Sequence, residues 1–432
     1  MSSVHTWRSL ALSLGVVTFV PPSAHGAAFQ LKENTAQGLG TAFAGVGSMA
    51  NSAATEFNNP AGMTQLPGLQ ISLGGSLVAP SFTFKGTATN VFGQPISGDT
   101  NRDGGHSAVV PQGYATYQVT PDLSVGIAVT SPFGLATYYG AGFAGRYQAD
   151  KTELQTVNVN PAVAYRVLPW LSLGAGFSAE HATAEFASAT NSQTISALVF
   201  GRPLPLRDGL FRLRGDDWSF GYNFGALIQP SPTTNIGLTY RSRVQHDFTG
   251  SVSFDAPLPL SLSPAFRSGA GAAKLVLPDT AAVSLTQKIS PLWTAYADVD
   301  WTNWSQFKNL DTFRGDGTPL SRTPERYRNS IFVSVGASYQ ATDKLALRAG
   351  TAFDKTPTTD LYRTARVPDG NRYWLAIGAS YTVVPRTTVD VGYAHVFVDG
   401  SKIRETSATG DVLNGRYDSK IDIFSLGTRT AF

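Results

Sequence analysis

The side chains that most often perform catalysis are few and scattered in this chain. Of its six histidines, His5 and His25 stand at the N-terminus, and no two histidines have the spacing of a metal site. The chain has no cysteine, no Gly-x-Ser-x-Gly elbow and no glycine-rich phosphate-binding loop. The sequence therefore gives no support to thiol, metal or nucleotide chemistry. We predict that the protein is not an enzyme and uses no cofactor and no metal.

Two long segments instead carry side chains suited to binding apolar molecules. Segments 189–215 and 255–273 contain the Gly, Pro and charged residues typical of loops, yet they also hold many large apolar residues. Exposed apolar clusters of this size usually mark a binding surface, although two such loops could also pack on each other. We predict that the substrate is bound by Leu198, Phe200, Leu204, Leu206 and Phe211 in the first segment, and by Leu258, Leu260 and Phe266 in the second.

The elements that must position these loops are strands, because apolar residues recur at every second position over most of the chain. Between Trp293 and Trp301 the odd-numbered residues are apolar, while the residues between them are largely polar. This period of two is that of a β-strand with one apolar face and one polar face. In a soluble sandwich the apolar face would point inward, whereas in a transmembrane barrel it would point at lipid.

The two ends of the chain favour the membrane barrel. Residues 1–26 have a short basic start, an apolar core and a small-residue site before Ala27, as a signal peptide does. No later apolar run is long enough for a membrane-spanning helix, and the last residue is the aromatic Phe432 on an alternating strand. Charged residues make up only 15% of the chain, below the usual soluble fraction of about 25%. The net charge of +3 is too small to indicate a nucleic-acid partner.

Turn signals divide residues 68–432 into fourteen strands. Short turns containing Pro, Asp or Asn recur at 120–122, 168–170, 230–232, 290–291, 341–343 and 384–386. Longer connections fall at 86–107, 136–151, 189–215, 255–273, 308–327, 355–371 and 401–416. An even number of strands joined alternately by short turns and long loops is typical of bacterial outer-membrane proteins. We therefore predict an all-β fold, a fourteen-stranded antiparallel transmembrane barrel.

Residues 27–67 do not follow the strand repeat. They are rich in small residues and compatible with short helical turns interrupted by glycine, so we predict a small helical hatch inside the lumen. Asn59-Pro60-Ala61 stands at the end of this segment, just before the first strand. An Asn-Pro pair can also form a plain turn. At this position we expect a rigid turn that holds the hatch against the wall opening.

Several motifs resemble one known family. Ala28-Phe29-Gln30-Leu31, Asn59-Pro60-Ala61-Gly62-Met63, Trp304-Ser305-Gln306-Phe307 and Val367-Pro368-Asp369 are similar, in this order, to the FadL family of outer-membrane transporters for long-chain fatty acids and other hydrophobic compounds. The resemblance covers essentially the whole mature chain. It implies a fourteen-stranded barrel with an N-terminal hatch, a hydrophobic capture groove between the third and fourth long loops, and lateral release through an inward kink in the third strand.

The sequence of the third strand itself supports such a kink. An alternating run from Leu123 to Val129 is interrupted by Ser131, Pro132, Phe133 and Gly134. Proline removes a donor from the ladder and glycine permits a bend, so these four residues are expected to open the wall. The alternative is that the strand ends there and Pro132 begins a loop.

The charged residues bear on the type of substrate. Arg241, Arg243, Asp247, Asp298, Asp300 and Arg348 are predicted on the polar, lumen-facing sides of their strands, as ion pairs. Fatty-acid members of the family carry basic residues that can meet a carboxylate, but the strand near His181 has no arginine where one is expected. We predict that Arg326 or Arg328 takes this role. The departure keeps neutral and aromatic hydrocarbons open as substrates.

Together these features predict passive uptake of a hydrophobic small molecule across the outer membrane of a Gram-negative bacterium by a monomer in contact with outer-membrane lipid. A barrel phospholipase is the competing enzyme, but His181, His246 and His395 lie on otherwise apolar strand faces, without a recognisable Ser-His-Asn arrangement. A general porin is the other alternative. It would need an open polar lumen, which the hatch would close.

Overall fold

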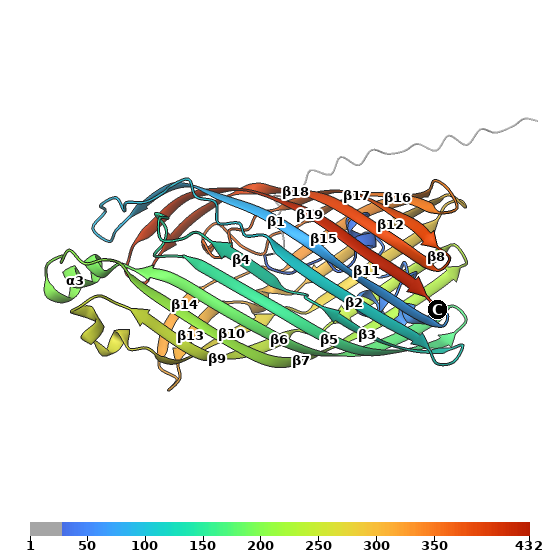
Figure 1. Cartoon of the computed structure of the whole chain (residues 1–432), viewed down its shortest axis with the longest axis horizontal. Helices are drawn as coiled ribbons and strands as arrows, with labels where there is room; N and C mark the ends of the chain where they lie inside the picture. The colour runs from blue at the N-terminus through green and yellow to red at the C-terminus, as the bar shows by residue number, and fades with distance from the viewer. Residues whose placement is uncertain (1–27) are drawn as a thin grey trace, which may run out of the picture.

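The strands of the protein run antiparallel around one closed wall (Figure 1). The structure is a computed structural model that describes residues 28–432, so the predicted signal peptide, residues 1–26, lies outside the described residues. The strand segments are β1 (Leu69–Thr89), β2 (Ala108–Gln118), β3 (Leu123–Thr130), β4 (Gly134–Tyr138), β5 (Lys151–Leu168), β6 (Leu171–Thr190), β7 (Gly209–Ser231), β8 (Thr234–Arg241), β9 (Val244–Asp255), β10 (Gly269–Leu277), β11 (Thr280–Lys288), β12 (Trp293–Thr302), β13 (Asn309–Arg314), β14 (Pro319–Pro324), β15 (Ser330–Gln340), β16 (Leu345–Asp354), β17 (Arg372–Val384), β18 (Thr387–Thr406) and β19 (Val412–Ala431).

Short helices occupy the interior and the loops. The α-helices are α1 (Ala36–Leu39), α2 (Thr55–Asn58) and α3 (Ser192–Phe200), and the 3-10 helices are η1 (Pro60–Gln65), η2 (Leu260–Leu262), η3 (Pro264–Phe266) and η4 (Trp304–Gln306). No helix among residues 28–432 is both long and apolar enough to cross a membrane.

The segments make fourteen barrel strands, as predicted. Five pairs of segments, β3 with β4, β8 with β9, β10 with β11, β12 with β13 and β14 with β15, continue one another along the same neighbours. The first strand pairs with the last from Gln70 opposite Ala431 to Thr89 opposite Val412, which closes the wall. All six predicted short turns fall between consecutive strands at one end of the barrel (Figure 1).

Two of the seven predicted long loops are mostly strand. Residues 308–327 contain β13 and β14, and residues 401–416 contain the end of β18 and the start of β19, which pair as far as Thr406 opposite Val412. Both segments contain Gly, Asp and Arg, a composition that indicated loops. These residues instead stand on strands whose outward side is exposed, so water-compatible side chains do not mark the end of a strand there.

The alternation of side chains fixes which face each residue takes. Along β7, Trp218, Phe220, Tyr222 and Phe224 are all exposed on the outer face, as lipid-facing residues of a barrel must be. Nearer the long loops the outward residues become charged, whereas the inward Leu213 is buried. The polarity of the two faces therefore inverts along a single strand.

Residues 28–66 lie inside the barrel, and we refer to them as the interior segment (Figure 1). Helix α1 packs on β17, β18 and β19, while η1 packs on β5, β6 and β7. The backbones approach so closely that a Cβ on Gly378 of β17 would lie 2.8 Å from the Cα of Gly40. Glycine is needed at both positions because a side chain on either would force the interior segment away from the wall. Whether this segment acts as a separate hatch stays a prediction.

Candidate functional site

An apolar cluster fills the interior of the barrel near the long loops. Its members come from the start of the interior segment, from the inward faces of the surrounding strands and from η4 and the nearby connections. They are Ala28, Phe29, Phe133, Leu154, Ala182, Ala184, Phe186, Leu213, Val244, Phe248, Ala273, Leu275, Leu277, Trp304, Phe307, Leu310, Tyr327 and Val367. The lumen of a transmembrane barrel is usually polar. An interior lined this way can accommodate an apolar molecule out of water.

Two hydrogen-bond donors in this cluster have no partner within residues 28–432. They are the indole Nε1 of Trp304 and the hydroxyl of Tyr327, and both side chains are almost fully buried. Their rings lie 5.7 Å apart, and Trp304 also packs edge-on against Phe29 at 4.8 Å. The buried carboxyl group of Glu325 lies next to the Tyr327 hydroxyl and can accept from it, so the Nε1 of Trp304 is the donor suited to the polar end of a bound molecule.

The wall is open beside the break between β3 and β4. Residues 108–112 of β2 pair with β1 but not with the third strand, whose pairing with β2 stops at Gly113 opposite Val129. On the other side, β3 and β4 both pair with β5, with one extra residue between Thr130 and Gly134. A cavity of about 450 Å³ lies between β2 and β4. The predicted kink residues therefore stand at a real break in the ladder.

The interior segment covers the inner side of this break. The backbone N–H of Leu31 donates to the carbonyl of Pro132 at 2.9 Å, and the N–H of Gly134 donates to the carbonyl of Phe29 at 3.0 Å. The N–H of Phe133 donates to the hydroxyl of Thr156 at 3.1 Å. The backbone groups left free by the break are thus satisfied by the interior segment and by β5, and the opening is blocked from within.

The start of the interior segment is fixed by two charged residues. Asp369 accepts a hydrogen bond from the N–H of Ala28 at 2.7 Å, and Arg372 donates to the carbonyl of Ala28 at 2.7 Å. Arg372 and Asp369 also form an ion pair at 2.9 Å. Both residues belong to the Val-Pro-Asp region that resembles the family, although the sequence did not indicate that they contact Ala28.

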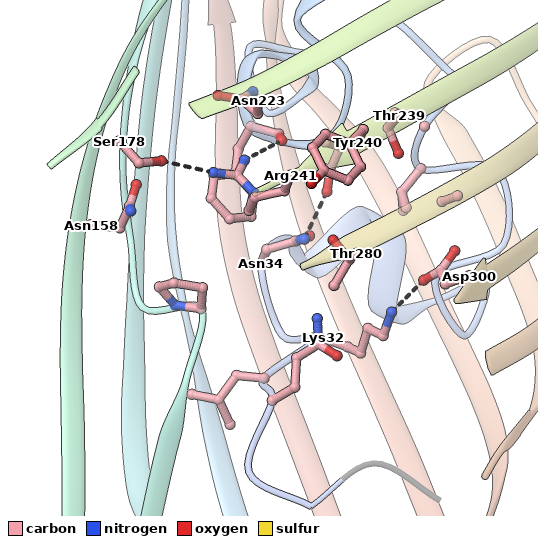
Figure 2. Close-up of a pocket in the computed structure, with 18 of the residues that line it drawn as sticks. Lys32, Asn34, Asn158, Ser178, Asn223, Thr239, Tyr240, Arg241, Thr280 and Asp300 are labelled. Atoms are coloured by element: carbon pink, nitrogen blue, oxygen red, sulfur yellow. Dashed lines mark hydrogen bonds and ion pairs between the residues drawn. The ribbon is translucent and has the colours of Figure 1, made fainter. Parts of the chain in front are cut away.

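A second, polar cavity lies on the other side of the interior segment (Figure 2). It has a volume of about 120 Å³. Arg241 donates to Ser178 and to the carbonyl of Phe57, and Lys32 forms an ion pair with Asp300. Residues Gln30, Leu31 and Phe133 line both this cavity and the one at the wall opening, so they separate the two spaces.

A buried histidine joins two carboxylates near this polar cavity. His246 lies with Nδ1 3.0 Å from Asp217 and Nε2 3.1 Å from Glu180, and its side chain is fully buried. Among residues 28–432, neither these three side chains nor any other group of His, Asp and Glu is arranged to hold a metal ion. The arrangement is a hydrogen-bonded network that links β6, β7 and β9. It lacks a serine partner of the kind a phospholipase requires.

The Asn59-Pro60-Ala61 motif caps η1 and bonds the interior segment to the barrel wall. The side chain of Asn59 accepts from the N–H of Ala61 at 3.2 Å at the start of η1. Its amide donates to the carbonyl of Gly47 at 2.7 Å and to that of Ala226 on β7 at 3.0 Å. The motif therefore holds two parts of the interior segment together and fixes them to β7.

Glu56 is buried beside this motif, and neither of its carboxylate oxygens has a partner within the described residues. Burial raises its pKa to about 8, while the positive charge of Arg241 acts in the opposite direction. A Cβ on Gly126 of β3 would meet the Glu56 side chain at 2.8 Å. Glu56 is therefore largely protonated at neutral pH, and its side chain packs against the third strand.

The structure places the predicted capture residues at the open end of the barrel. Leu198, Phe200 and Leu258 are exposed, and the neighbouring Leu262 is 78% exposed. Leu204, Leu206, Phe211 and Phe266 are half-buried. Leu260 is only 3% exposed, unlike the exposed position expected for it, because η2 turns its side chain inward. An ion pair of 2.6 Å between Arg207 and Asp255 joins the two loops. Their role in capture stays a prediction.

The two predicted carboxylate partners lie beside the apolar cluster rather than in it. Arg326 and Arg328 are both exposed, and Arg326 stacks on the ring of Tyr362 at 5.1 Å. Tyr327, between them, is the residue that points into the cluster. The segment between β14 and β15 is irregular, and Arg326 has a left-handed φ of 43°, so the local backbone turns Tyr327 inward while both arginines stay outside. A role for either arginine stays a prediction.

Some lumen charges were predicted on the wrong face. Asp298, Asp300, Arg348 and Arg241 face the interior, but Arg243 and Asp247 face outward. The break between β8 and β9 at 242–243 shifts the alternation by one residue. The sequence did hold one signal for the apolar interior: along β7 the outward apolar run of Trp218 to Phe224 is followed, nearer the loop, by an inward Leu213.

Comparisons with known proteins agree with the resemblance. A family model described as "Outer membrane protein transport protein (OMPP1/FadL/TodX)" matches residues 17–432. The 47 kDa outer membrane protein of Pasteurella multocida (strain Pm70) is 32% identical over 406 residues, which cover 91% of this chain and 92% of that protein. The long-chain fatty acid transport protein of Escherichia coli (strain K12) is 29% identical over 434 residues, covering 94% and 95%.

The fold is also that of a solved structure. The crystal structure of a Pseudomonas aeruginosa FadL homologue superposes with a TM-score of 0.88 at 24% sequence identity and covers 94% of this chain and 99% of the other. At this identity the likeness supports the architecture alone. With the family model matching nearly the whole chain, the conclusion is direct: the chain belongs to the outer membrane protein transport protein (OMPP1/FadL/TodX) family and is an outer-membrane transport protein rather than an enzyme.

Proposed function

We propose that the protein takes up long-chain fatty acids passively and releases them laterally into the outer membrane. The observation that carries the proposal is the apolar cluster inside a barrel whose lumen would otherwise be expected to be polar. An alkyl chain gains about 0.8 kcal/mol for each CH₂ removed from water, so partitioning into such an interior needs no energy source. The transport protein of Escherichia coli named above, whose name specifies long-chain fatty acids, supports this substrate class.

Capture begins at the loops in this proposal. Leu198 and Phe200 on α3, with Leu258 and Leu262 in the opposite loop, present apolar surface to water at the end where the strands leave the membrane. Large exposed apolar patches on a protein usually mark binding surfaces. From there the substrate passes to the half-buried Phe211, which packs on the interior cluster.

The unpartnered donor of Trp304 favours a fatty acid over a hydrocarbon. A carboxyl group would accept a hydrogen bond from the Nε1 of Trp304, whereas a neutral alkane or an aromatic hydrocarbon would leave this donor unsatisfied. Uptake of neutral or aromatic hydrocarbons remains the second candidate, because the apolar lining by itself would bind them equally well. A general porin is disfavoured by the buried interior segment that fills the lumen.

The exit in this proposal is the opening between β2 and β4. The cavity there is blocked from inside only by the segment that bonds Phe29 and Leu31 to the kink residues. Withdrawal of these residues would connect the interior with the wall opening, and a hydrophobic molecule would leave into lipid without crossing water.

The loop surface gives a direct test of capture. Replacing the exposed Leu198 and Leu262 with aspartate should weaken oleate binding to the purified barrel by about tenfold or more, because two leucine contacts are lost. Binding is measured by displacement of a fluorescent fatty acid. The matched control is Leu361→Asp with Val91→Asp, which charges two exposed apolar residues on other loops. Equal binding by both double variants and the unchanged protein would refute capture at these loops.

A further inference from the structure

Three basic side chains face outward in one row across neighbouring strands. Arg416 of β19 stands directly opposite Lys85 of β1 on one side and opposite Lys402 of β18 on the other. We call these residues the basic row. All three are exposed, with side-chain exposures of 50% for Lys85 and 64% for Arg416. β1, β19 and β18 are seen side by side in Figure 1.

The outward direction is fixed by what lies on the inner face. Phe84, Tyr417 and Ile403, each next in sequence to a member of the row, are fully or almost fully buried in one apolar cluster inside the barrel. Because successive side chains of a strand point to opposite faces, the three cations cannot turn inward. They are held beside one another on the outer surface.

Like charges in direct register are unfavourable unless something compensates them. Asp418 reaches Lys85 at 2.7 Å and Arg416 at 3.6 Å, so one carboxylate serves two cations. Within residues 28–432, Lys402 has no ion-pair partner, and neither has Arg404, which lies two residues along on the same face. Two further carboxylates lie near the row: Asp399 bonds to Asn371 and Tyr373, and Asp103, beside Thr83 of β1, accepts from the hydroxyl of Ser81. The row therefore keeps an excess of positive charge.

The opposite side of the barrel shows that this excess is not a general property of its exposed strands. There four of the outward cations have a carboxylate: Arg207 has Asp255 at 2.6 Å, Lys274 has Asp247 at 3.7 Å, Arg322 has Asp311 at 2.7 Å and Arg212 has Glu185 at 3.3 Å. Arg214 and Arg243, which are also exposed there, have no ion pair within residues 28–432, but neither stands in register with a second cation. Solubility of the exposed strand ends would be served equally well by such pairs. Protection of a sheet edge is not the reason either. Beyond Val78 β1 no longer pairs with β2, but the backbone of residues 100–104 bonds to that side of β1, and β19 pairs with the other side.

The row stands just above the lipid-facing surface. Below it, the outer face of the same strands carries Leu77, Phe397 and Phe424, all exposed and apolar. Lys420 lies directly opposite Phe397, where the outer face changes from apolar to polar. Arg416 lies four residues before Lys420 on β19, roughly 13 Å along the strand toward the long loops. The row is thus at the height of lipid headgroups at the end of the barrel that carries the long loops.

We propose that the basic row binds the phosphate groups of outer-leaflet lipid headgroups. Arginine offers a planar pair of donors to phosphate oxygens, and lysine offers a flexible point charge. Basic residues just outside the apolar part of a membrane protein attract anionic headgroups in this way. The bound lipid would neutralise the row while its acyl chains cover Leu77 and Phe424.

Lipopolysaccharide is a suitable probe, because its headgroup carries phosphates in the outer leaflet. The full mature protein is purified in detergent, mixed with lipopolysaccharide, and the ratio of lipid-bound to free barrel is measured by native mass spectrometry. The triple variant Lys85→Gln, Lys402→Gln and Arg416→Gln should lower that ratio by about tenfold or more. The control triple variant, Arg207→Gln, Lys274→Gln and Arg322→Gln, removes the same charge from the opposite side and should leave it unchanged. Heat-modifiable mobility on a gel verifies that both variants fold.

Three results would overturn the proposal. The first is undiminished lipid binding by the basic-row variant, and the second is an equal loss in the control variant. The third is release of the lipid by inorganic phosphate at a concentration equal to that of the lipid phosphate, because the site would then prefer a soluble anion to a headgroup.

Discussion

At the scale of single residues, Glu56 gives the interior segment a dependence on pH. Its pKa is about 8 in the folded protein and 4.5 for a free carboxyl group, so the folded state holds the proton more tightly. The favourable packing is complete below pH 4.5 and weakens as the pH rises toward 8, by about 1.4 kcal/mol per pH unit. We expect the segment to loosen in mildly alkaline solution.

Replacing Glu56 with glutamine tests this directly, because glutamine keeps the shape and cannot ionise. Amide hydrogen exchange of residues 53–60, corrected for the intrinsic effect of pH, should lose protection between pH 5.5 and pH 8.5 in the unchanged protein. The Glu56→Gln variant should keep its protection at both values. Asp343→Asn, in an exposed short turn, is the control and should respond as the unchanged protein does. An identical loss of protection in the glutamine variant would show that another group controls the segment.

The sequence predicted the role of a residue correctly where its type has one common structural role, and failed where its type has several. The Asn59-Pro60 turn was identified because a proline after an asparagine allows few conformations. Trp304 was missed as a donor because only the fold shows that its polar atom lacks an acceptor. Arg326 and Arg328 were predicted to meet a carboxylate because they are charged. The buried side chain, however, is that of Tyr327 between them.

At the scale of elements, the break in the third strand controls the wall. Replacing Pro132 with threonine and Gly134 with valine should extend the ladder toward β2, because a donor returns and the bend becomes less accessible. A Cβ at position 134 would meet the Cδ1 of Leu31 at 2.9 Å, but this atom is the end of a flexible side chain that can turn aside and leave the interior segment in place. We expect uptake of oleate into cells to fall at least several-fold.

The control for that experiment is Pro161→Thr, which removes a proline from β5 opposite Ile127, where the ladder is unbroken. It should leave uptake unchanged. If a folded Pro132→Thr, Gly134→Val variant transports oleate at the normal rate, the substrate leaves by another route.

The boundaries of the strands show which strand ends can be predicted from the alternation of apolar and polar residues. Short turns were located correctly because proline, aspartate and asparagine stop a strand for local reasons. The ends of β13, β14, β18 and β19 were not, because polar residues outside the membrane are compatible with both loop and strand. The outward direction of Arg243 and Asp247 followed from a shift at 242–243 that no local signal in the sequence marks.

At the scale of the whole molecule, the interior segment is expected to block ion flow. Deleting residues 29–67 should leave a barrel that assembles, because the strands pair with one another all around the wall. In a planar bilayer this barrel should conduct ions steadily, whereas the unchanged protein should not. Deleting residues 91–95 from an exposed loop is the control and should leave the conductance low. Equally low conductance in both deletions would show that the loops, and not the interior segment, close the barrel.

The attachment of Ala28 inside the wall also constrains how the molecule is made. Its backbone is bonded to Asp369 and Arg372, and the wall around it is completed only when the first strand meets the last. The interior segment must therefore be in position before the two ends of the sheet join, since afterwards it would have to be threaded through a finished ring. Order of assembly is thus built into the topology, and the closure of the barrel between β1 and β19 comes last. The C-terminal Phe432, by contrast, is exposed and free to carry an affinity tag.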